Sequence, residues 1–153
     1  MLKAGDKAPE FILQNQDGID VNLKDLLGKK LVLYFYPKDN TSGCSLEAHD
    51  FTSLLEEFEN FGANIIGISP DSIQSHKKFI QNKGLKIMLL SDPNRSVSAS
   101  YGAFGTKKLY GKEVQGIIRS TFIIDKSGII LECFYNVKAK DHAKKVLQRL
   151  QEL

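Results

Sequence analysis

The chain has 153 residues, of which 42% are hydrophobic and 25% charged, a composition typical of globular proteins and not of disordered or collagen-like chains. Its length matches one ordinary domain and allows a sizeable core, so folding needs no metal or disulfide. The longest apolar run, Leu31 to Tyr36, is far shorter than the roughly 18–20 residues of a membrane span, which excludes a transmembrane protein.

The net charge of +3 is unevenly distributed along the chain. Residues 1–76 carry 6 Lys/Arg and 12 Asp/Glu, a net charge of −6, whereas residues 77–153 carry 15 and 6, a net charge of +9. The lysines of the basic half occur singly or in pairs without a nucleic-acid motif, so we expect solvated helix faces and no nucleic-acid partner. The charged N-terminal stretch and the two cysteines predict neither a secretory signal nor a disulfide scaffold, but a cytoplasmic protein.

The first predicted elements are a hairpin and a buried strand. Residues 11–13 and 19–23 flank an Asp17-Gly18 turn, and Asp-Gly between apolar runs is a hairpin signal. Residues 31–36 are apolar on both faces, as expected of a central strand, and Pro37 ends that strand because proline cannot donate to a ladder.

Helices and strands alternate through the rest of the chain. The predicted elements are a helix from Cys44 to Gly62, a strand over 65–68, a helix from Ser69-Pro70-Asp71 to about Asn82, a strand over 87–90, a brief helix from Asp92-Pro93 to Tyr101-Gly102, a loop over 103–116, strands over 117–124 and 129–137 joined by a turn, and a final amphipathic helix over 143–153. This order implies a mixed sheet covered by helices, in one domain spanning residues 1–153.

The segment with the clearest chemistry runs from the buried strand through a polar loop into a helix. Cys44 falls in the first helical turn, where unpaired backbone N–H groups and the helix dipole favour a thiolate over a thiol. Thr41 lies three residues earlier, and as an N-cap its hydroxyl would point at the Cys44 backbone N–H. Position alone leaves two interpretations open: a reactive cysteine, or a small core residue behind a capping threonine.

The sequence YFYPKDNTSGCSLEA resembles the reactive segment of the peroxiredoxins, in the subfamily called bacterioferritin comigratory protein or PrxQ. The resemblance extends over essentially the whole chain. It includes APEF near the N-terminus, GISPDS at 67–72, LLSDPN at 89–94, YGAFGTKKLYGK at 101–112 and GIIRSTFIID at 116–125. It implies an α/β, thioredoxin-like fold, with a central mixed β-sheet flanked by helices and an N-terminal β-hairpin extension.

The resemblance also implies roles for individual residues. Cys44 matches the peroxidatic cysteine, Pro37 the proline that shields the sulfur from water, and Thr41 the threonine that hydrogen-bonds the peroxide. Arg119 matches the arginine that holds thiolate and peroxide together, and a guanidinium can fork two hydrogen bonds. Glu47 occupies a family glutamate position, with a supporting role.

This chain departs from the family at the resolving cysteine. Many members carry it five residues after the reactive one, where this chain has His49, and others carry it in the following helix, near Ile80. Cys133 lies on the more apolar face of its strand and is interpreted as inert core filler, a possible but disfavoured resolving residue. We therefore expect a one-cysteine enzyme.

The three histidines are not expected to bind metal. His49 lies about 140° around the helix from Cys44 and is predicted to be solvated. His76 and His142 are predicted on polar faces without ligand-spaced neighbours, so no metal and no cofactor are expected.

The resulting expectation is a thiol-specific peroxidase for hydrogen peroxide and organic hydroperoxides, recycled by thioredoxin or another thiol reductant, acting as a monomer or weak dimer. A thioredoxin-like disulfide reductase is disfavoured because Glu47 stands where Cys-x-x-Cys needs its second thiol. A cysteine hydrolase would not need the set of Pro37, Thr41 and Arg119. A non-catalytic redox sensor or thiol-based partner-binding module is the alternative, and it would react once without turnover.

Overall fold

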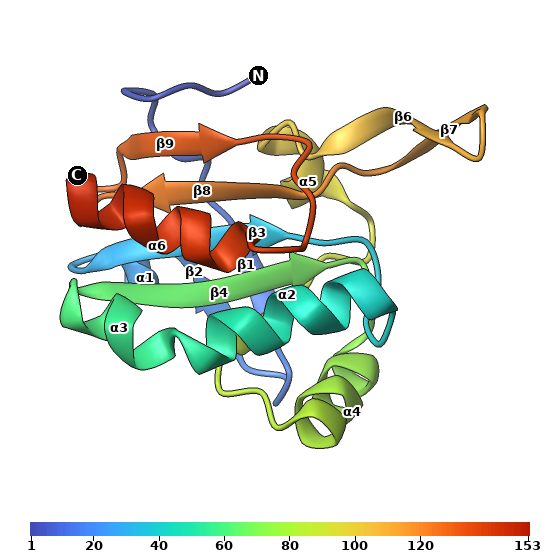
Figure 1. Cartoon of the computed structure of the whole chain (residues 1–153), viewed down its shortest axis with the longest axis horizontal. Coiled ribbons are helices and arrows are strands. Elements are labelled where there is room, and N and C mark those ends of the chain that lie inside the picture. Colours follow the sequence, from blue (N-terminus) through green and yellow to red (C-terminus); the bar gives the residue numbers. More distant parts are fainter.

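A computed structural model describes all residues 1–153, and its centre is a seven-stranded mixed sheet (Figure 1). The elements are β1 (Ile12–Asn15), β2 (Asp20–Asn22), α1 (Leu23–Leu26), β3 (Lys30–Phe35), α2 (Ser42–Ser53), α3 (Leu55–Asn60), β4 (Ala63–Ser69), α4 (Ile73–Lys83), β5 (Met88–Ser91), α5 (Ser96–Ser100), β6 (Phe104–Leu109), β7 (Lys112–Ile117), β8 (Ser120–Ile124), β9 (Ile130–Phe134) and α6 (His142–Glu152).

The strand order is β2-β1-β5-β4-β3-β8-β9, with β3, β4 and β5 parallel to one another. The hairpin of β1 and β2 joins the edge of β5, and β8 and β9 continue the sheet antiparallel on the other side of β3. The expected mixed sheet with an N-terminal hairpin is therefore confirmed. None of the helices is both long and apolar enough to cross a membrane.

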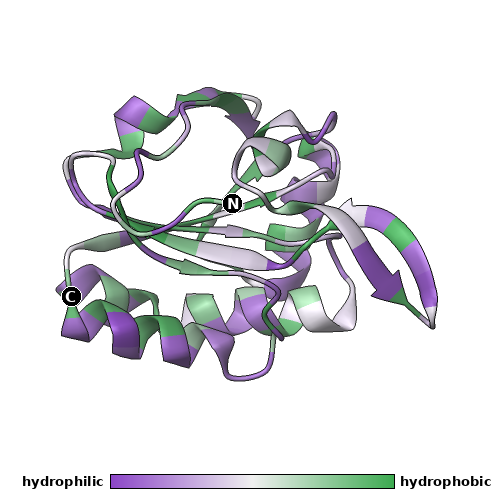
Figure 2. Ribbon diagram, turned by 90° about the horizontal axis from the view of Figure 1, so that it is seen from above, coloured by the Kyte–Doolittle hydropathy of each residue, from purple (hydrophilic) through white to green (hydrophobic).

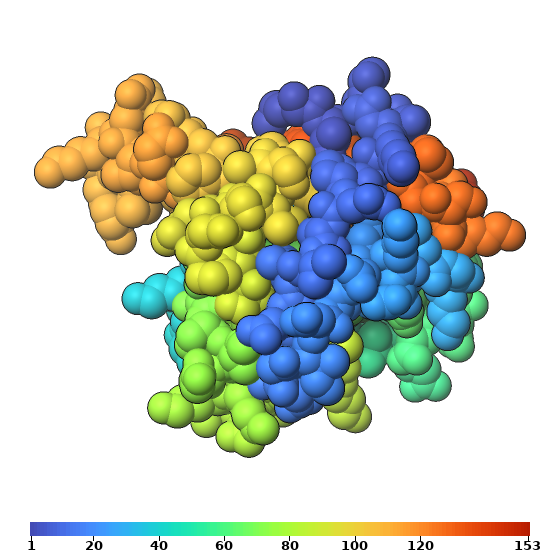
Figure 3. Space-filling view, turned by 180° about the vertical axis from the view of Figure 1, so that it is seen from behind, coloured from blue at the N-terminus to red at the C-terminus, as the bar shows by residue number.

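Two cores cover the two faces of this sheet. Helices α2, α3, α4 and α6 pack on one face, seen as the helical layer below the sheet in Figure 2. The N-terminal segment, α1 and the α5 region cover the other face, and Figure 3 shows the N-terminal residues lying across it. Residues of β3 alternate between the cores, with Val32 and Tyr34 in the first and Leu33 and Phe35 in the second, so the prediction of a central strand buried on both faces is confirmed.

The helix predicted to run from Cys44 to Gly62 is instead two helices. Leu54, with φ −98° and ψ 3°, separates α2 from α3. Leu54 and Leu55, on either side of this break, both pack against the first core.

The loop predicted over residues 103–116 is also wrong, because β6 and β7 form a hairpin that projects from the body (Figure 1). Tyr110 and Gly111 both have positive φ, 52° and 78°, as a two-residue hairpin turn requires. Only the base of the hairpin is buried, so its sequence lacks the apolar alternation by which a strand is recognised.

Gly67 of β4 allows close contact between neighbouring side chains. A Cβ there would lie 2.8 Å from Leu89 Cδ2 and 2.9 Å from Tyr34 Cζ. We predict that Gly67→Ala lowers the free energy of unfolding by about 1–3 kcal/mol through overpacking, measured by urea denaturation. Gly105→Ala is the matched control, because its Cβ would meet nothing closer than Ile118 Cδ1 at 3.6 Å. Equal stability of the two variants would contradict the prediction.

Candidate active site

Cys44 is the third residue of α2, which begins directly after the loop that follows β3. Thr41 is the N-cap, with extended backbone dihedrals, and Cys44 is only 1% exposed. The sulfur thus lies within the first turn of a helix, where backbone N–H groups lack intrahelical partners and the dipole is positive. The position predicted from the sequence is confirmed.

Arg119 reaches Cys44 from the connection between β7 and β8. Its Nη2 donates to Cys44 Sγ at 3.3 Å, and its Nη1 donates to Glu47 Oε1 at 2.5 Å. The Arg119 carbonyl accepts a hydrogen bond from Val137 N at 3.0 Å, which fixes the backbone behind the guanidinium. Residues 75 positions apart in the chain are therefore in direct contact.

Glu47 is fully buried one turn after Cys44, and its Oε2 has no hydrogen-bond partner. Burial raises the pKa of Glu47 to about 7, although the Arg119 charge acts to lower it. Burial alone would lower the pKa of Arg119, but the charges of Glu47 and Cys44 outweigh it and raise that pKa. Arg119 therefore stays cationic while Glu47 titrates near neutral pH.

Tyr34 adds a neutral phenol to this buried group. Burial, together with the charges of Glu47 and Cys44, raises the pKa of Tyr34 well above its ordinary value. Its hydroxyl is buried without a hydrogen-bond partner. The sequence analysis took Tyr34 only as part of the apolar strand, and nothing in that pattern distinguishes its hydroxyl from a core ring.

Gly43 makes room for the guanidinium. A Cβ at Gly43 would lie 3.3 Å from Arg119 Nη2, closer than most side chains approach. The backbone of Gly43 is helical, so the constraint at this position is space and not a special φ. A small residue before Cys44 thus permits the contact between Arg119 and the sulfur.

Pro37 and Thr41 lie in the loop that leads to the helix, but the predicted capping bond is wrong. Pro37 is partly buried directly after Tyr36, and Thr41 is exposed. The Thr41 hydroxyl donates to the Lys38 carbonyl at 2.9 Å and makes no bond to the Cys44 N–H. A carbonyl three residues back competes for the hydroxyl, as is common for threonine in turns.

Cys133 lies on the opposite face of the sheet from Cys44. It pairs with Phe122 in the register of β8 and β9, and both residues belong to the second core, whereas Cys44 belongs to the first. Burial raises the pKa of the half-buried Cys133 thiol, as do the charges of Glu132 and Asp6. The structure thus places it among apolar side chains, away from Cys44.

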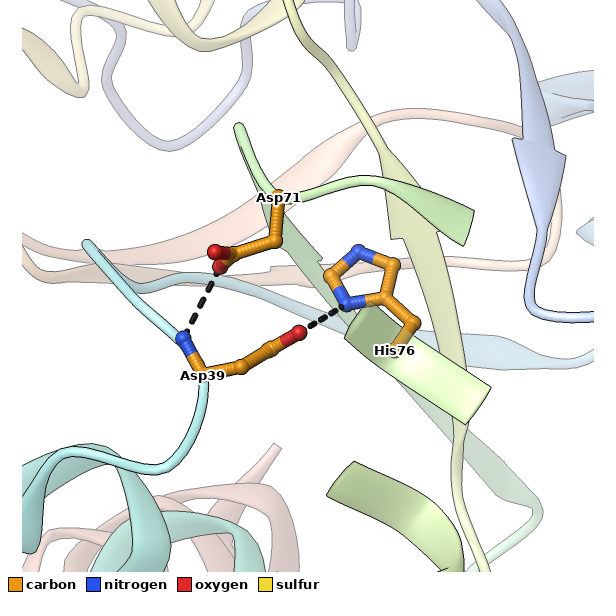
Figure 4. A group of neighbouring side chains, drawn as sticks. All are labelled: Asp39, Asp71 and His76. Carbon is orange, nitrogen blue, oxygen red and sulfur yellow. Dashed lines mark hydrogen bonds and ion pairs between the residues drawn. The ribbon is translucent and has the colours of Figure 1, made fainter. Parts of the chain in front are cut away.

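Two of the three predictions for histidines are wrong. His49 is exposed as predicted, but His76 and His142 are buried. Figure 4 shows His76 beside Asp39 and Asp71, whose potential ligand atoms lie within 4.8 Å of those of the histidine. These residues come from three separate segments, so no spacing in the sequence indicates the cluster.

His142 begins α6 and lies 2.7 Å from Thr121 Oγ1 through its Nε2. Burial, with the positive charges of Arg119 and Lys145, lowers the pKa of His142 to about 4. The imidazole is therefore neutral at physiological pH and adds no second cation beside Arg119.

The main surface hollows lie elsewhere. One of about 660 Å³ lies beside Lys107 and Ile118, and three others have volumes of about 450, 470 and 490 Å³. Cys44 lines none of them.

The lowered pKa of His142 predicts a loss of stability in acid. Between pH 6.5 and 4 the unfolded chain binds a proton at this histidine and the folded chain does not, so the free energy of unfolding falls as pH falls. We expect His142→Asn to remove up to about 3 kcal/mol of this dependence, measured by urea denaturation across that range. Glu47 contributes the opposite slope between pH 4.5 and 7, but it is present in both proteins.

The exposed His49 provides the control, because His49→Asn should leave the acid dependence unchanged. Parallel pH profiles of the wild type and His142→Asn would contradict this interpretation.

Comparison with known proteins agrees with the geometry. The profile of the AhpC/TSA family matches residues 4–133. A protein of Helicobacter pylori named as a peroxiredoxin bcp is 57% identical over 149 residues, 97% of this chain and 98% of that protein. Peroxiredoxin Bcp of Bacillus subtilis is 43% identical over 152 residues, 99% of this chain and 97% of that one.

Solved structures agree as well. A cysteine-to-serine mutant of PrxQ from Xylella fastidiosa superimposes with a TM-score of 0.93 at 35% identity, covering 99% of this chain and 97% of that one. The bacterioferritin comigratory protein of Xanthomonas campestris superimposes with a TM-score of 0.87 at 38% identity, covering 93% and 90%. The fold is thus thioredoxin-like, and the chain belongs to the AhpC/TSA family as a peroxiredoxin of the Bcp/PrxQ type, a class of peroxide-reducing enzymes.

Proposed function

We propose that this peroxiredoxin reduces hydrogen peroxide and organic hydroperoxides through a sulfenic acid on Cys44, and that an external thiol such as thioredoxin recycles it. The observation that carries the proposal is the contact of Arg119 Nη2 with Cys44 Sγ in the first turn of α2. A guanidinium and a helix N-terminus both stabilise the thiolate, which is the nucleophilic form of cysteine.

In the proposed reaction the Cys44 thiolate attacks the terminal oxygen of the peroxide. A sulfur–oxygen bond forms, the oxygen–oxygen bond breaks, and its electron pair leaves on the alkoxide or hydroxide, which takes a proton to become alcohol or water. Cys44 is oxidised to the sulfenic acid. A preorganised cation such as Arg119 stabilises the charge that develops on the leaving oxygen.

The neighbouring residues would assist this step without forming bonds to the sulfur. Arg119 would act as the catalytic cation. Its Nη1 donates to the Glu47 carboxylate, which would hold the guanidinium in place. Thr41 would hydrogen-bond the peroxide after turning its hydroxyl away from the Lys38 carbonyl. Pro37 would limit the access of water from the loop side.

We propose a one-cysteine cycle because the other cysteine, Cys133, lies in the other core. His49 and Ile80 occupy the positions at which the family resemblance leads us to expect a resolving cysteine. Two Xanthomonas campestris PrxQ structures are mutants of two different cysteines, and the same separation from Cys44 would place the second at Ile80. This chain therefore lacks that partner.

Recycling would then proceed in two steps. A donor thiol condenses with the sulfenic acid, releasing water and forming a mixed disulfide with Cys44. A second thiol displaces Cys44, which leaves reduced, while the donor becomes the disulfide. Since such donors are kept reduced in the cytoplasm, we propose that this single-domain enzyme acts there, as a monomer or weak dimer.

The decisive experiment compares Cys44→Ser with Cys133→Ser. We expect Cys44→Ser to abolish peroxide consumption in the presence of a thiol donor, and Cys133→Ser to retain it within about twofold, measured as steady-state turnover. After one equivalent of peroxide, intact mass should show one added oxygen on the wild type and on Cys133→Ser, and none on Cys44→Ser.

Three results would count against the proposal. Peroxide turnover by Cys44→Ser would rule out Cys44 as the reactive residue. An intramolecular disulfide between Cys44 and Cys133 on a non-reducing gel would rule out the one-cysteine cycle. A single oxidation without turnover, in the presence of each candidate donor, would favour a redox sensor over an enzyme.

A larger side chain at position 43 tests the role of Arg119 without removing the arginine itself. Gly43→Ala should displace Nη2 by a few tenths of an ångström and lower the second-order rate constant with peroxide by about three- to tenfold, because the barrier depends steeply on alignment. The free energy of unfolding should not fall, since alanine favours the helix. Ser42→Ala, at the exposed neighbouring position, is the control, and an unchanged rate in Gly43→Ala would contradict the assigned role.

A further inference from the structure

Glu47 is bound through only one of its two carboxyl oxygens. It follows Cys44 by three residues in α2, so the two side chains are neighbours on one face of the helix. Oε1 accepts a hydrogen bond from Arg119 Nη1, whereas Oε2 is buried without a partner. The whole residue is 0% exposed. One oxygen of the carboxyl thus holds the guanidinium, and the other oxygen takes no part in holding it.

The unpartnered oxygen is a favourable place for a proton. A buried carboxylate oxygen without a hydrogen bond costs more free energy than a neutral hydroxyl in the same place. Protonation at Oε2 removes the charge and leaves Oε1 able to accept from Arg119. Burial raises the pKa of Glu47 to about 7, and the charge of Asp50 acts in the same direction. The geometry and this pKa both indicate that Glu47 can hold a proton near neutral pH.

Arg119 links this carboxyl to the Cys44 sulfur. Its Nη1 donates to Glu47 and its Nη2 donates to Sγ at 3.3 Å, so one guanidinium faces two acids, both of them buried. If both acids were ionised, the three groups would carry a net negative charge away from water, which is costly. With one proton held between the two acids, the guanidinium faces a single anion and the charges balance.

The other ionisable groups packed around this pair do not supply a proton. Tyr34 of β3 keeps its phenol proton, since burial raises its pKa well above the ordinary value. His142, which begins α6 and packs on Phe51 of α2, has a pKa lowered to about 4 by burial and is neutral. The pKa of Arg119 is raised, so the guanidinium stays protonated. Among these groups, Glu47 is the one that exchanges a proton near neutral pH.

We propose that Cys44 and Glu47 share one proton, and that Glu47 Oε2 delivers it to the oxygen that leaves the peroxide. Before the reaction, the proton passes from the Cys44 thiol to the Glu47 carboxylate, which gives a thiolate and a carboxylic acid facing Arg119. This inference rests on the proposed reaction of Cys44 with peroxide, and it assigns the source of the proton in that reaction.

The step is balanced within the site. The thiolate attacks the terminal oxygen of ROOH, the sulfur–oxygen bond forms and the oxygen–oxygen bond breaks. The electron pair of the broken bond leaves on RO⁻, and the proton of Glu47 converts it to ROH. Cys44 becomes the sulfenic acid, which keeps the hydrogen of the attacked oxygen, and Glu47 becomes the carboxylate. During recycling, the second donor thiol releases a proton as it displaces Cys44, and Glu47 takes up a proton again.

Glu47→Gln separates proton donation from the holding of Arg119. Glutamine has nearly the shape of glutamate, and its carbonyl oxygen can accept from Nη1, but its amide nitrogen replaces Oε2 and releases no proton. Tyr34→Phe is the control, because it removes another buried oxygen that lacks a partner and leaves the ring in place. Both variants are made in a Cys133→Ser parent, so that Cys44 is the only thiol.

The leaving group of the oxidant distinguishes the two roles of Glu47. Hydrogen peroxide releases hydroxide, which needs a proton, whereas peracetic acid releases acetate, which needs none near neutral pH. We expect Glu47→Gln to lower the second-order rate constant by about 100-fold with hydrogen peroxide, as for a lost general acid, and by no more than about threefold with peracetic acid. Tyr34→Phe should change the ratio of the two rate constants by less than about twofold.

Proton uptake gives an independent readout. Reduced protein is mixed with one equivalent of hydrogen peroxide in a weakly buffered solution that contains a pH indicator, near neutral pH. Glu47→Gln should take up about one more proton for each sulfenic acid formed than the parent and Tyr34→Phe do, because its site stores none. In the parent itself, the reaction with hydrogen peroxide should be at least about 1.5-fold slower in deuterium oxide, and the reaction with peracetic acid unchanged.

Equal slowing of Glu47→Gln with both oxidants, without additional proton uptake, would show that Glu47 only positions Arg119. That result would overturn the proposal and leave the proposed function intact. A changed proton balance in Tyr34→Phe, or the absence of a deuterium effect in the parent, would also overturn it. A parent that reacts with neither oxidant would contradict the proposed function, and this inference with it. Urea denaturation checks that each variant is folded, and if Glu47→Gln is not, the deuterium effect in the parent decides.

Discussion

The contact between the Arg119 guanidinium and the Cys44 sulfur is the constraint on which the rest of the site depends. The two residues lie 75 positions apart in the sequence, one at the start of α2 after β3 and the other between β7 and β8. They meet because β8 pairs with β3 in the sheet, so that the end of one strand lies beside the start of the other. Gly43 and the Val137–Arg119 backbone bond then set the final approach.

That contact brings charged groups together in a buried site. The neighbouring side chains limit how many of these groups are ionised at once. If Cys44 and Glu47 were both ionised, one guanidinium would face two anions without water around them. The raised pKa of Glu47, about 7, lets the site lose one of these negative charges by taking up a proton. His142, kept neutral by its lowered pKa, and the Tyr34 phenol add no further charge beside Arg119.

The sequence predicts those parts of this arrangement that are local. Apolar runs and turn residues predict β3, β4 and β5, the N-terminal hairpin of β1 and β2, and the strands β8 and β9. The change to a helical spacing of apolar residues predicts Cys44 at the start of a helix. Arg119 is different, because only the family resemblance connects it with Cys44 across 75 residues. The β6–β7 hairpin is missed because its outer part buries nothing, and the buried His76 and His142 are missed because their partners, Asp39 and Thr121, lie far away in the sequence. Pairwise contacts of this kind leave no periodic signal.

The position of Cys133 supports the proposal that an outside thiol recycles Cys44. Successive side chains of a strand point to opposite faces, and Cys133 shares the face of Phe122 and the second core. A disulfide needs Cα atoms within about 7 Å and Cβ atoms directed at each other. Cys133 is held in β9 by its pairing with β8, which also carries Thr121 against His142. Because Cys44 and Cys133 lie in different cores on opposite faces of the sheet, we infer that the thiol that resolves an oxidised Cys44 comes from another molecule.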